Sequence, residues 1–366
     1  MRKTKAIIDL NALRHNAALA KKTAPDSVLI GVIKANAYGH GAVAAAQALD
    51  GLCGAFAVAY IDEAVELQDS GIKKDILLLE GFTDADELKT VADRQFWTVV
   101  HHQHQLDFLD HYTGPPLKHI TLKVDTGMHR LGLTPEETRS AAKKMKENGN
   151  AQTLSLTTHF SISDLLDDNY TRQQIDIIQT LAAELDLPIA MANSGGILGW
   201  DDSHSHWNRA GIMLYGVTPF DHAHPAADQL QAVMTLQAPV IALRSIDAGE
   251  CVGYGRNWCA KRKSTIATLA IGYADGYPRV VKAGTDCYIH GQRAKLVGNI
   301  SMDMITIDVT DIPEVTIGDM VELWGKNIPV NEVAMAAGTI GYELVARVAP
   351  RVPRIYEGTV LKDAHR

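Results

Sequence analysis

The amino-acid sequence predicts an α/β protein with an N-terminal (β/α)8 TIM-like barrel and a C-terminal antiparallel β domain. Short apolar runs recur through the first 217 residues, and amphipathic segments with helical spacing separate them. Eight such units favour a closed barrel over a doubly wound sheet, because they repeat evenly and no GxGxxG turn follows the first strand. After about residue 235, short β-rich runs alternate with glycine-containing turns, which is typical of an antiparallel β domain.

The barrel strands are expected at the apolar runs of the first part of the chain. These are Leu29–Lys34, Ala55–Tyr60, Ile76–Glu80, Phe96–Val100, Ile120–Asp125, Leu154–His159, Ile189–Asn193 and Ile212–Gly216. Helices are expected between them, where apolar residues recur with a helical period. These are Ala42–Leu49, Ile61–Ser70, Ala85–Asp93, Gln103–His111, Pro135–Asn148 and Tyr170–Leu185.

The change of pattern predicts two domains, residues 1–235 for the barrel and residues 236–366 for the β domain. The first strand of the chain, Lys5–Leu10, is expected to pair with the second domain. The strands expected within that domain are Gln237–Ala242, Thr265–Ile271, Thr285–Ile289, Ala294–Val297, Met304–Val309 and Met320–Trp324, and the expected helices are Val330–Ala337 and Tyr342–Val348.

Composition limits the classes of function. A chain of 366 residues suits about two domains, and its net charge of -8 argues against nucleic acid and anionic membranes as partners. No apolar stretch is long enough to span a membrane, and the apolar run after the basic start, Met1–Lys5, is too short for a signal peptide. The four cysteines lack CxxC spacing, so we expect reduced thiols in a cytoplasmic protein rather than a disulfide or zinc framework.

Two groups of histidines are interpreted as ordinary surface features. His101, His102 and His104 fit an exposed helix start, and His204 and His206 fit a polar loop. No metal site is therefore expected.

Polar side chains follow the ends of several barrel strands. They are Lys34, Glu80, Lys123, Asp125, His159, Asn193 and Ser194. The carboxyl ends of barrel strands all meet at one mouth, where barrel enzymes place their chemistry. Convergence from several strands therefore predicts one active site there.

Lys34 is the most informative of these residues. It ends the first apolar run and lies within Gly-Val-Ile-Lys-Ala-Asn-Ala-Tyr-Gly-His-Gly. A lysine sheltered at a barrel mouth loses hydration, which lowers its pKa and favours the free amine. A free amine forms Schiff bases with carbonyl groups, and pyridoxal 5'-phosphate is the commonest such cofactor. Taken alone, the lysine is better explained by a side chain that snorkels from the rim, and the flanking residues are what favour the cofactor.

Further motifs supply groups that suit a phosphate or a carboxylate, each with a structural alternative. Tyr38 can donate to a phosphate oxygen, or can simply pack at a loop edge. The segment 122–132 places Lys123, Asp125 and Arg130 at the mouth, where an arginine holds a carboxylate or phenolate with a planar fork. The alternative is an ion pair between Asp125 and Arg130 that only braces the loop.

Three further motifs lie later in the chain. A serine hydroxyl with backbone N–H groups at glycine turns makes a phosphate cradle, which suits Ser194 and the segment 209–212, although Ser-Gly-Gly is also a common loop. Tyr273, in the turn Gly-Tyr-Ala-Asp-Gly-Tyr-Pro-Arg, can act as an acid–base group near a cationic cofactor. Its alternative is a structural tyrosine whose hydroxyl is bound to backbone.

Together these motifs resemble those of the alanine racemases. VIKANAYGHG, LKVDTGMHRLG, THF, NSGG, GYADGYPR, SMDM, GYEL and RVPR occur in the order of that family across nearly the whole chain. The resemblance implies an enzyme that uses pyridoxal 5'-phosphate and is built from an α/β barrel and a C-terminal β domain. It also implies a small amino-acid substrate and a homodimer with two composite active sites.

The resemblance implies a role for each matching residue. Lys34 would carry the cofactor and act as one acid–base group, and Tyr273 from the second subunit would act as the other on the opposite face. Arg130 would bind the phenolic oxygen of the cofactor and the carboxylate of the substrate. The phosphate would be held by Tyr38, Ser194, Tyr342 and the backbone of Gly211 and Ile212.

The remaining implied roles support these groups. Lys123, as a carbamate, would orient Arg130. Arg209 would face the pyridine nitrogen and keep it neutral, with His159 beside it. Met302 would come with Tyr273 from the second subunit and lie near the substrate.

Two positions depart from the pattern of the family. Asn299 stands where most members have an arginine that lines the substrate entrance with an acidic partner, here matched by Asp164. We hypothesise altered or broader substrate choice. Ala210 stands where proline is usual, which should leave the role of Arg209 intact.

The predicted function is that of an isomerase that interconverts L-alanine and D-alanine by a two-base mechanism and supplies D-alanine for peptidoglycan. A racemase of serine or of broader range, a decarboxylase on the same scaffold and a non-catalytic cofactor-binding protein are the alternatives. Tyr273 and an arginine at the pyridine nitrogen argue against a decarboxylase, whose chemistry favours a protonated nitrogen. The β domain argues against the non-catalytic protein, because such proteins resemble the barrel alone.

Overall fold

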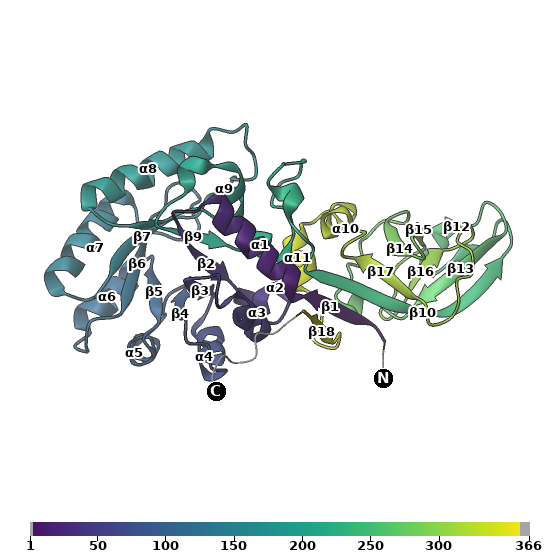
Figure 1. Cartoon of the computed structure of the whole chain (residues 1–366), viewed down its shortest axis with the longest axis horizontal. Coiled ribbons are helices and arrows are strands. Elements are labelled where there is room, and N and C mark those ends of the chain that lie inside the picture. Colours follow the sequence, from purple (N-terminus) through teal and green to yellow (C-terminus); the bar gives the residue numbers. More distant parts are fainter. Residues whose placement is uncertain (1–2, 359–366) are drawn as a thin grey trace.

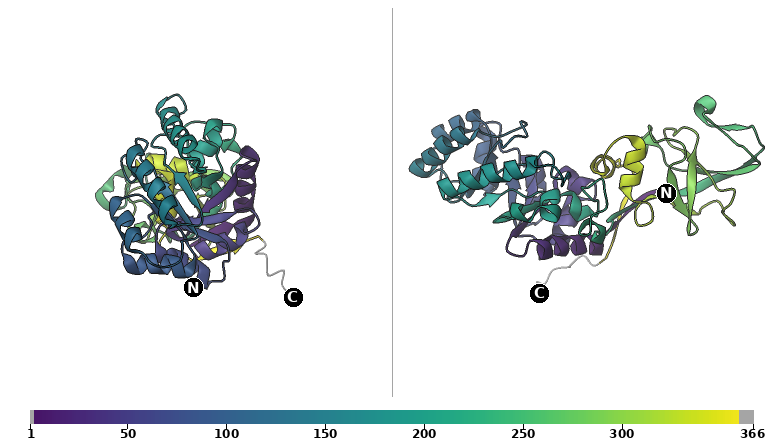
Figure 2. Two further views of the ribbon diagram at one scale, coloured as in Figure 1. Left: turned by 90° about the vertical axis from the view of Figure 1, so that its left-hand side faces the viewer. Right: turned by 90° about the horizontal axis from the view of Figure 1, so that it is seen from above.

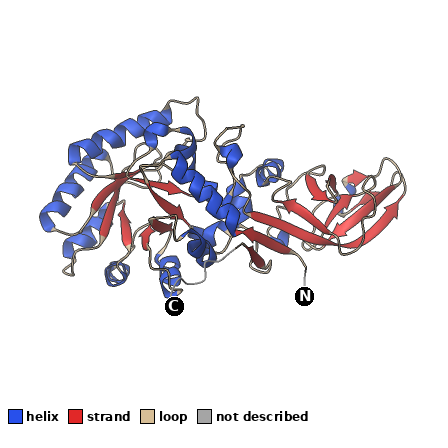
Figure 3. Ribbon diagram, viewed as in Figure 1, coloured by secondary structure: helices blue, strands red, loops and turns tan. Residues whose placement is uncertain are grey.

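The computed structural model describes residues 3–358 and shows an elongated molecule of two parts (Figure 1). Helices surround strands in one part, and strands dominate the other (Figure 3). Met1 and Arg2 of the basic start, and residues 359–366 of the predicted second domain, lie outside the described residues. In residues 3–358, no helix combines the length and the apolar character that crossing a membrane requires.

The N-terminal part is a closed barrel of eight parallel strands, which confirms the predicted architecture. Its strands are β2 (Val28–Val32), β3 (Ala55–Val58), β4 (Asp75–Leu78), β5 (Trp97–Val100), β6 (His119–Lys123), β7 (Leu154–Thr157), β8 (Ile189–Ala190) and β9 (Trp207–Ala210). Helices form its outer layer (Figure 2). They include α1 (Leu10–Thr23), α3 (Ala42–Leu49), α4 (Ile61–Asp69), α5 (Ala85–Arg94), α6 (Gln103–His111), α7 (Pro135–Asn148), α8 (Tyr170–Leu185) and α9 (Ser194–Gly199).

The inside of the barrel is packed and is not a pore. Buried side chains from six of its strands fill it, namely Ile30, Val32, Ala55, Ala57, Leu77, Val99, Ala190 and Trp207. A larger core lies between the barrel strands and their helices and continues into the second part. Open volume for a ligand therefore remains at the mouth, above this packed interior.

Two barrel elements differ from the sequence prediction. The eighth strand is β9, Trp207–Ala210, whereas the run expected as that strand begins with the short helix η2 (Ile212–Tyr215). Arg209 interrupts the apolar pattern of β9, so the sequence does not indicate a buried strand there. All four residues of η2 are buried and apolar, and such a run is easily mistaken for a barrel strand. The prediction also omits helix α1. Alanines supply much of its buried face and contrast only weakly with its polar residues, so the helical period is weak in the sequence.

The second part is one eight-stranded sheet in the order β13-β16-β15-β14-β17-β10-β1-β18. Its strands are β1 (Lys5–Asp9), β10 (Met234–Ile246), β13 (Ser264–Leu269), β14 (Asp286–Ile289), β15 (Gln292–Val297), β16 (Ile305–Asp308), β17 (Met320–Trp324) and β18 (Arg354–Glu357). β1 runs antiparallel to β10 and parallel to β18, and all other pairs are antiparallel. The first and last strands of the described chain therefore lie side by side (Figure 1).

Two short helices lie between β17 and β18 in the chain, and the second of them packs against the barrel. They are α10 (Val330–Ala337) and α11 (Gly341–Ala346), and α11 packs against the turn after β2. The C-terminal part thus contributes to the mouth of the barrel.

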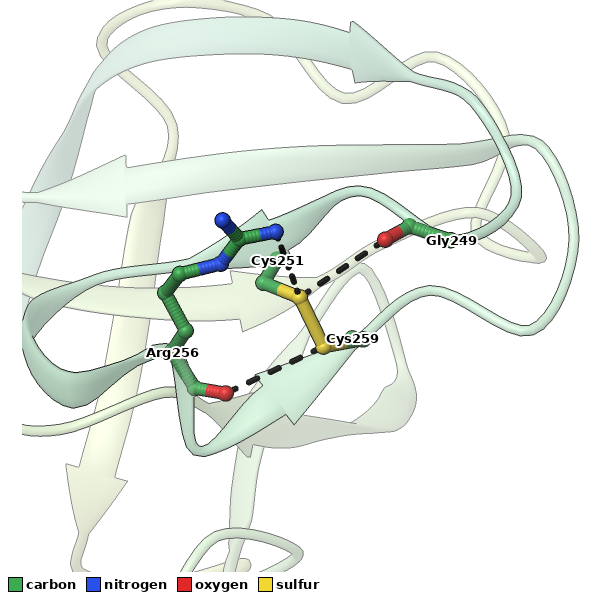
Figure 4. Close-up of a disulfide and its surroundings, with 4 residues drawn as sticks. All are labelled: Gly249, Cys251, Arg256 and Cys259. Atoms are coloured by element: carbon green, nitrogen blue, oxygen red, sulfur yellow. Dashed lines mark hydrogen bonds between the residues drawn. A yellow bond between two sulfur atoms is a disulfide. The ribbon is translucent and has the colours of Figure 1, made fainter.

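The expectation of reduced thiols is wrong for two of the four cysteines. Cys251 and Cys259 form a disulfide that joins β11 (Cys251–Val252) to β12 (Trp258–Cys259) (Figure 4). The two cysteines are eight residues apart and lie opposite each other in a hairpin, an arrangement that a search for CxxC spacing does not detect. Cys53 and Cys287 are buried free thiols, and burial raises the pKa of each to about 12.

The two groups of histidines lie near a helix start and in a loop, as the sequence predicts. His102 precedes α6 and accepts a hydrogen bond from the N–H of His104, and both are exposed. His204 follows a short helical turn. The described residues contain no group of three or more His, Cys, Asp or Glu side chains that could hold a metal ion.

Candidate active site

A cavity of about 320 Å³ opens at the carboxyl ends of the barrel strands. Its wall contains ten residues that the sequence assigns to one site: Lys34, Tyr38, Lys123, Arg130, His159, Ser194, Arg209, Gly211, Ile212 and Tyr342. Nine of them come from the barrel, and Tyr342 comes from α11. The C-terminal part of the same chain therefore completes one side of the cavity.

Lys34 begins a turn of unusual backbone, the segment labelled α2 (Lys34–Tyr38) in Figure 1. The four residues after Lys34 all have φ of 51° or 52°, in the left-handed region, and Gly39 follows with φ of 81°. For residues other than glycine this conformation costs roughly 1–2 kcal/mol each. Contacts from neighbouring loops must therefore hold the turn.

Glu63 of α4 supplies the main contacts. Its Oε1 accepts from the N–H of Ala35 at 2.6 Å, and its Oε2 accepts from the N–H groups of Ala59 at 2.8 Å and Tyr60 at 3.2 Å. The side chain of Asn36 accepts from the N–H of Ala42 at 2.8 Å. One carboxylate thus links the loops after β2 and β3 and fixes the backbone that carries the lysine.

Ser194 and Tyr38 supply hydrogen-bond donors without a cation, and Gly211 leaves the space beside them open. Ser194 Oγ accepts from the N–H groups of Gly211 at 3.1 Å and Met213 at 3.2 Å, which leaves its own proton as a donor. A Cβ atom at Gly211 would lie 2.9 Å from Tyr38 Oη, so glycine keeps this space open. Burial raises the pKa of Tyr38 to about 12, so that its phenol stays protonated and donates. This donor set fits a phosphate group.

Arg209 is held rigidly in the floor of the cavity. Its Nη1 donates to Thr157 Oγ1 at 2.7 Å and to the carbonyl oxygen of Ala190, and its Nη2 donates to the carbonyl oxygens of Thr158 at 2.6 Å and Met191 at 3.2 Å. Burial lowers the pKa of Arg209 to about 10, which still leaves the guanidinium protonated at neutral pH. A fixed cation of this kind fits a ring nitrogen that is to stay unprotonated.

Lys123 lies at the end of β6 among other cations. Burial lowers the pKa of its amine to about 8; Glu80 opposes this shift, and Arg209, Arg130 and Lys34 add to it. A substantial fraction of the amine is therefore neutral near pH 8. The neutral amine is the form that reacts with carbonyl compounds and carbon dioxide.

The possible ion pair between Asp125 and Arg130 is replaced by another pair. Asp125 Oδ2 contacts His129 Nδ1 at 2.8 Å, and its Oδ1 accepts from the N–H groups of Gly127 and His129, each at 3.0 Å. Burial would raise the pKa of Asp125, but these hydrogen bonds lower it on balance. Arg130 lies in the cavity wall rather than in this pair.

His159 is neutral in this surrounding. Burial lowers its pKa well below the ordinary value, and the charges of Arg209, Arg130 and Lys123 lower it further. A neutral imidazole can accept and pass a proton without adding a further charge to the cluster.

Tyr273 and Met302 do not line this cavity. They lie in the second part, where Tyr273 begins the turn η5 (Tyr273–Asp275), and their exposed fractions are 39% and 54%. The N–H of Tyr273 donates to the carbonyl oxygen of Ser301 at 3.1 Å, and the N–H of Ala274 donates to that of Met302 at 3.0 Å. The two motifs thus form one surface, which we call the Tyr273 platform (residues 272–275 and 301–303).

Arg351 joins the two halves of the Tyr273 platform. Its Nε donates to Asp275 Oδ1 at 2.6 Å, and its Nη2 donates to Asp303 Oδ1 at 2.5 Å. Asp275 Oδ2 also accepts from the N–H of Gly272 at 2.9 Å. Three separate sequence motifs are therefore parts of one small structure.

Sequence reasoning missed three residues that position the site, namely Glu63, Thr157 and Thr158. Glu63 follows Tyr60 by three residues at a helix start, a capping pattern that indicates bonding to backbone N–H groups. Thr157 is a polar residue near the end of an apolar strand, which was a usable signal. The contact of Thr158 with Arg209 uses only its backbone oxygen, so its side chain carried no signal.

The fold and the cavity define a class of protein, the barrel enzymes that carry a second β domain and work with pyridoxal 5'-phosphate. Residues 8–219 match the family model "Alanine racemase, N-terminal domain", and residues 233–356 match "Alanine racemase, C-terminal domain". The chain belongs to the alanine racemase family, a family of isomerases, as the motifs of the sequence indicate.

Relatives of known sequence and structure cover the whole chain. It is 45% identical over 358 residues to "Alanine racemase, catabolic" of Pseudomonas aeruginosa, with 98% of this chain and 100% of the relative covered. It is 47% identical over 352 residues to the alanine racemase of Chromohalobacter salexigens, with 96% and 97% covered.

Two solved structures show the same architecture. The biosynthetic alanine racemase of Pseudomonas aeruginosa superposes with a TM-score of 0.94 at 41% identity, covering 98% of this chain and 100% of that one. The alanine racemase of Bartonella henselae, whose structure contains covalently bound pyridoxal phosphate, gives 0.88 at 32% identity, covering 97% and 99%.

Proposed function

We propose that this chain interconverts L-alanine and D-alanine by a two-base mechanism, in a homodimer with two composite active sites. The observation that carries the proposal is the separation of the two predicted acid–base groups. Lys34 lies in a cavity with anion-binding groups, whereas Tyr273 is exposed on the other part of the same chain. A second copy that brings its Tyr273 platform to this cavity completes the site.

The surface around Tyr273 supports association with a second copy. Exposed apolar side chains lie in the platform and in segments bonded to the stretch that leads into it, among them Met302 at 54%, Met304 at 46% and Tyr254 at 72%. Exposed apolar side chains that gather on one surface are typical of a protein–protein interface. A two-fold dimer uses this surface twice and makes two equivalent sites.

The residues of the cavity fit pyridoxal 5'-phosphate at each end. Ser194 and Tyr38 offer donors to a phosphate that lies beside Gly211. Arg209 offers a fixed cation to the ring nitrogen, and Lys34 offers the amine that binds the carbonyl carbon. The bound cofactor supplies an electron sink that makes the α-hydrogen of an amino acid acidic. A neutral ring nitrogen limits that sink, which suppresses side reactions.

The protein then has to move one proton between the two faces of the α-carbon. Lys34 accepts the α-proton on one face or returns it there, and the partner subunit's Tyr273 does the same on the other face. Arg130 binds the substrate carboxylate with its planar fork, so that the α-carbon stays between the two groups. One base alone would return the proton to the face that it left.

Lys123 is proposed to carry a carbamate that orients Arg130. Its amine has a pKa of about 8, so the neutral form needed for reaction with carbon dioxide is present at neutral pH. Arg209, Arg130 and Lys34 surround it with positive charge, and a carbamate would convert this repulsion into attraction.

We infer that the product D-alanine serves peptidoglycan synthesis, the role expected from the family resemblance. A cytoplasmic site of action remains part of this proposal. The argument from cysteine no longer supports it, because two cysteines form a disulfide, a bond typical of oxidising compartments.

The proposed mechanism is tested by following L-alanine in D2O with the cofactor-loaded protein. The expected result is D-alanine that carries deuterium at the α-carbon. Tyr273→Phe should abolish inversion and leave binding of the cofactor unchanged, whereas Tyr288→Phe on strand β14 is the matched control and should have no effect. Inversion that persists in Tyr273→Phe would remove Tyr273 from the mechanism.

A further inference from the structure

The hairpin closed by Cys251 and Cys259 is a feature that the roles described so far do not use. Its strands β11 and β12 have two residues each, and the loop between them turns through Gly253, Gly255 and Arg256, which have φ of 74°, 74° and 51°. A two-stranded ribbon of this length is barely stable by itself. The disulfide between its ends is therefore a main constraint on its shape (Figure 4).

This hairpin is attached to the segment that leads into the Tyr273 platform. The side-chain amide of Asn299 donates to the carbonyl oxygen of Tyr254 at 2.8 Å. A Cβ atom at Gly298 would lie 2.9 Å from the carbonyl oxygen of Val252, so the two backbones are in close contact. Ser301 follows two residues after Asn299 and accepts from the N–H of Tyr273. A shift of the hairpin is thus transmitted to the neighbourhood of Tyr273 and Met302.

The tip of the hairpin presents an aromatic side chain to its surroundings. Tyr254 is 72% exposed, the second highest exposed fraction among the large apolar side chains of the described chain. Its backbone is held by Asn299, and its side chain remains largely exposed. Through Asn299 the tip is joined to the segment that leads into the Tyr273 platform, which completes the site in the proposed dimer.

The disulfide is also arranged for reduction by thiols. Cys259 is exposed, and Cys251 is partly covered, with the guanidinium of Arg256 donating to its sulfur at 3.6 Å (Figure 4). A thiolate that attacks the exposed Cys259 sulfur would release Cys251 as a thiolate beside this cation. A nearby arginine stabilises a thiolate and makes it a better leaving group.

We propose that the hairpin 251–259 is a wall of the composite active site that restricts the side chain of the substrate, and that its disulfide keeps this wall in place. The proposal rests on the proposed function, because the wall acts on the site of the partner subunit. In the oxidised protein, the wall favours the methyl side chain of alanine. In the reduced protein, the hairpin loosens, alanine binds less well and longer side chains gain access.

A dithiol such as dithiothreitol supplies the electrons and protons for the reduction. Two successive thiol–disulfide exchanges break the bond between Cys251 and Cys259 and form the cyclic disulfide of the reagent. Two electrons and two protons pass to the protein, which then carries two thiols in the hairpin.

The experiment compares the oxidised and the reduced holoenzyme with L-alanine and with L-methionine, whose side chain is longer. Reduction should raise KM for L-alanine with kcat changed less than about twofold. The ratio of kcat/KM for alanine to that for methionine should fall by roughly tenfold. The double variant Cys251→Ser/Cys259→Ser should behave like the reduced protein in the absence of any reductant, and Asn299→Ala should shift the ratio in the same direction.

Cys53→Ser is the matched control, because Cys53 is a buried free thiol far along the chain in the barrel. It should respond to the dithiol as the wild-type chain does. Unchanged KM and unchanged discrimination after reduction would overturn the proposal, as would four titratable thiols in protein unfolded without reductant. Failure of the oxidised protein to racemise alanine would instead refute the proposed function, and this inference with it.

Discussion

Lys123 shows how the neighbours of one side chain change its chemistry. Its amine has a pKa of about 8 because it is buried, and the cations around it add to this effect. The sequence predicted that Lys123 lies at the mouth. It did not predict the lowered pKa, because the surrounding charges come from residues that are distant in the chain.

The carbamate on Lys123 should therefore depend on pH in a defined direction. At a fixed pressure of carbon dioxide, raising the pH through 8 converts the ammonium to the reactive amine, so the carbamate should increase from pH 7 to pH 9. Carbon-13 NMR with labelled carbon dioxide measures it directly. The signal should be lost in Lys123→Ala and kept in Lys143→Ala, an exposed lysine of α7. A signal that is absent or falls over this range would contradict the prediction.

The turn that follows β2 shows the limit of sequence reasoning at the scale of an element. Its glycines and its position after an apolar run were visible, and they predicted a tight turn that carries Lys34. Four consecutive left-handed residues were not predictable, because three of them are alanine or tyrosine with no preference for that region. The conformation depends on Glu63, which lies in another element.

Removal of the Glu63 carboxylate should loosen this turn. Glu63→Ala leaves the N–H groups of Ala35, Ala59 and Tyr60 without their acceptor, and we expect a loss of about 2 kcal/mol in the free energy of unfolding. Cofactor affinity should fall as well, because Lys34 and Tyr38 lie on the turn. Urea unfolding and titration with the cofactor measure the two effects. Glu66→Ala, exposed on the same helix, should change neither.

Most other elements follow from local patterns. The helices α3, α6, α7 and α8 begin and end where the periodicity predicts. The eighth strand was misplaced because a buried arginine inside it has partners, in β7 and the loops after β7 and β8, that no local pattern reveals. The disulfide was missed for a similar reason, since it depends on the register of a hairpin whose strands have only two residues each.

At the scale of the whole molecule, the separation of Lys34 from Tyr273 leads to a test by complementation. Lys34→Ala and Tyr273→Phe should each be inactive alone. After dissociation and random reassociation of equal amounts, half of the dimers are mixed, and each mixed dimer contains one site with both residues intact. Activity should recover to about a quarter of that of the wild-type chain. A mixture that stays inactive, while chromatography shows mixed dimers, would place both residues in one subunit.

The position of β1 has a consequence for how the chain is made. This strand is synthesised before the barrel, yet it lies between β10 and β18, and the entire barrel separates it from both in the sequence. The emerging chain must therefore keep β1 unpaired while the ribosome completes the barrel, and its two neighbours become available only when β10 and later β18 have left the exit tunnel. The barrel is in effect an insertion within the β domain, because β1, which precedes it, and β10 and β18, which follow it, are neighbours in one sheet.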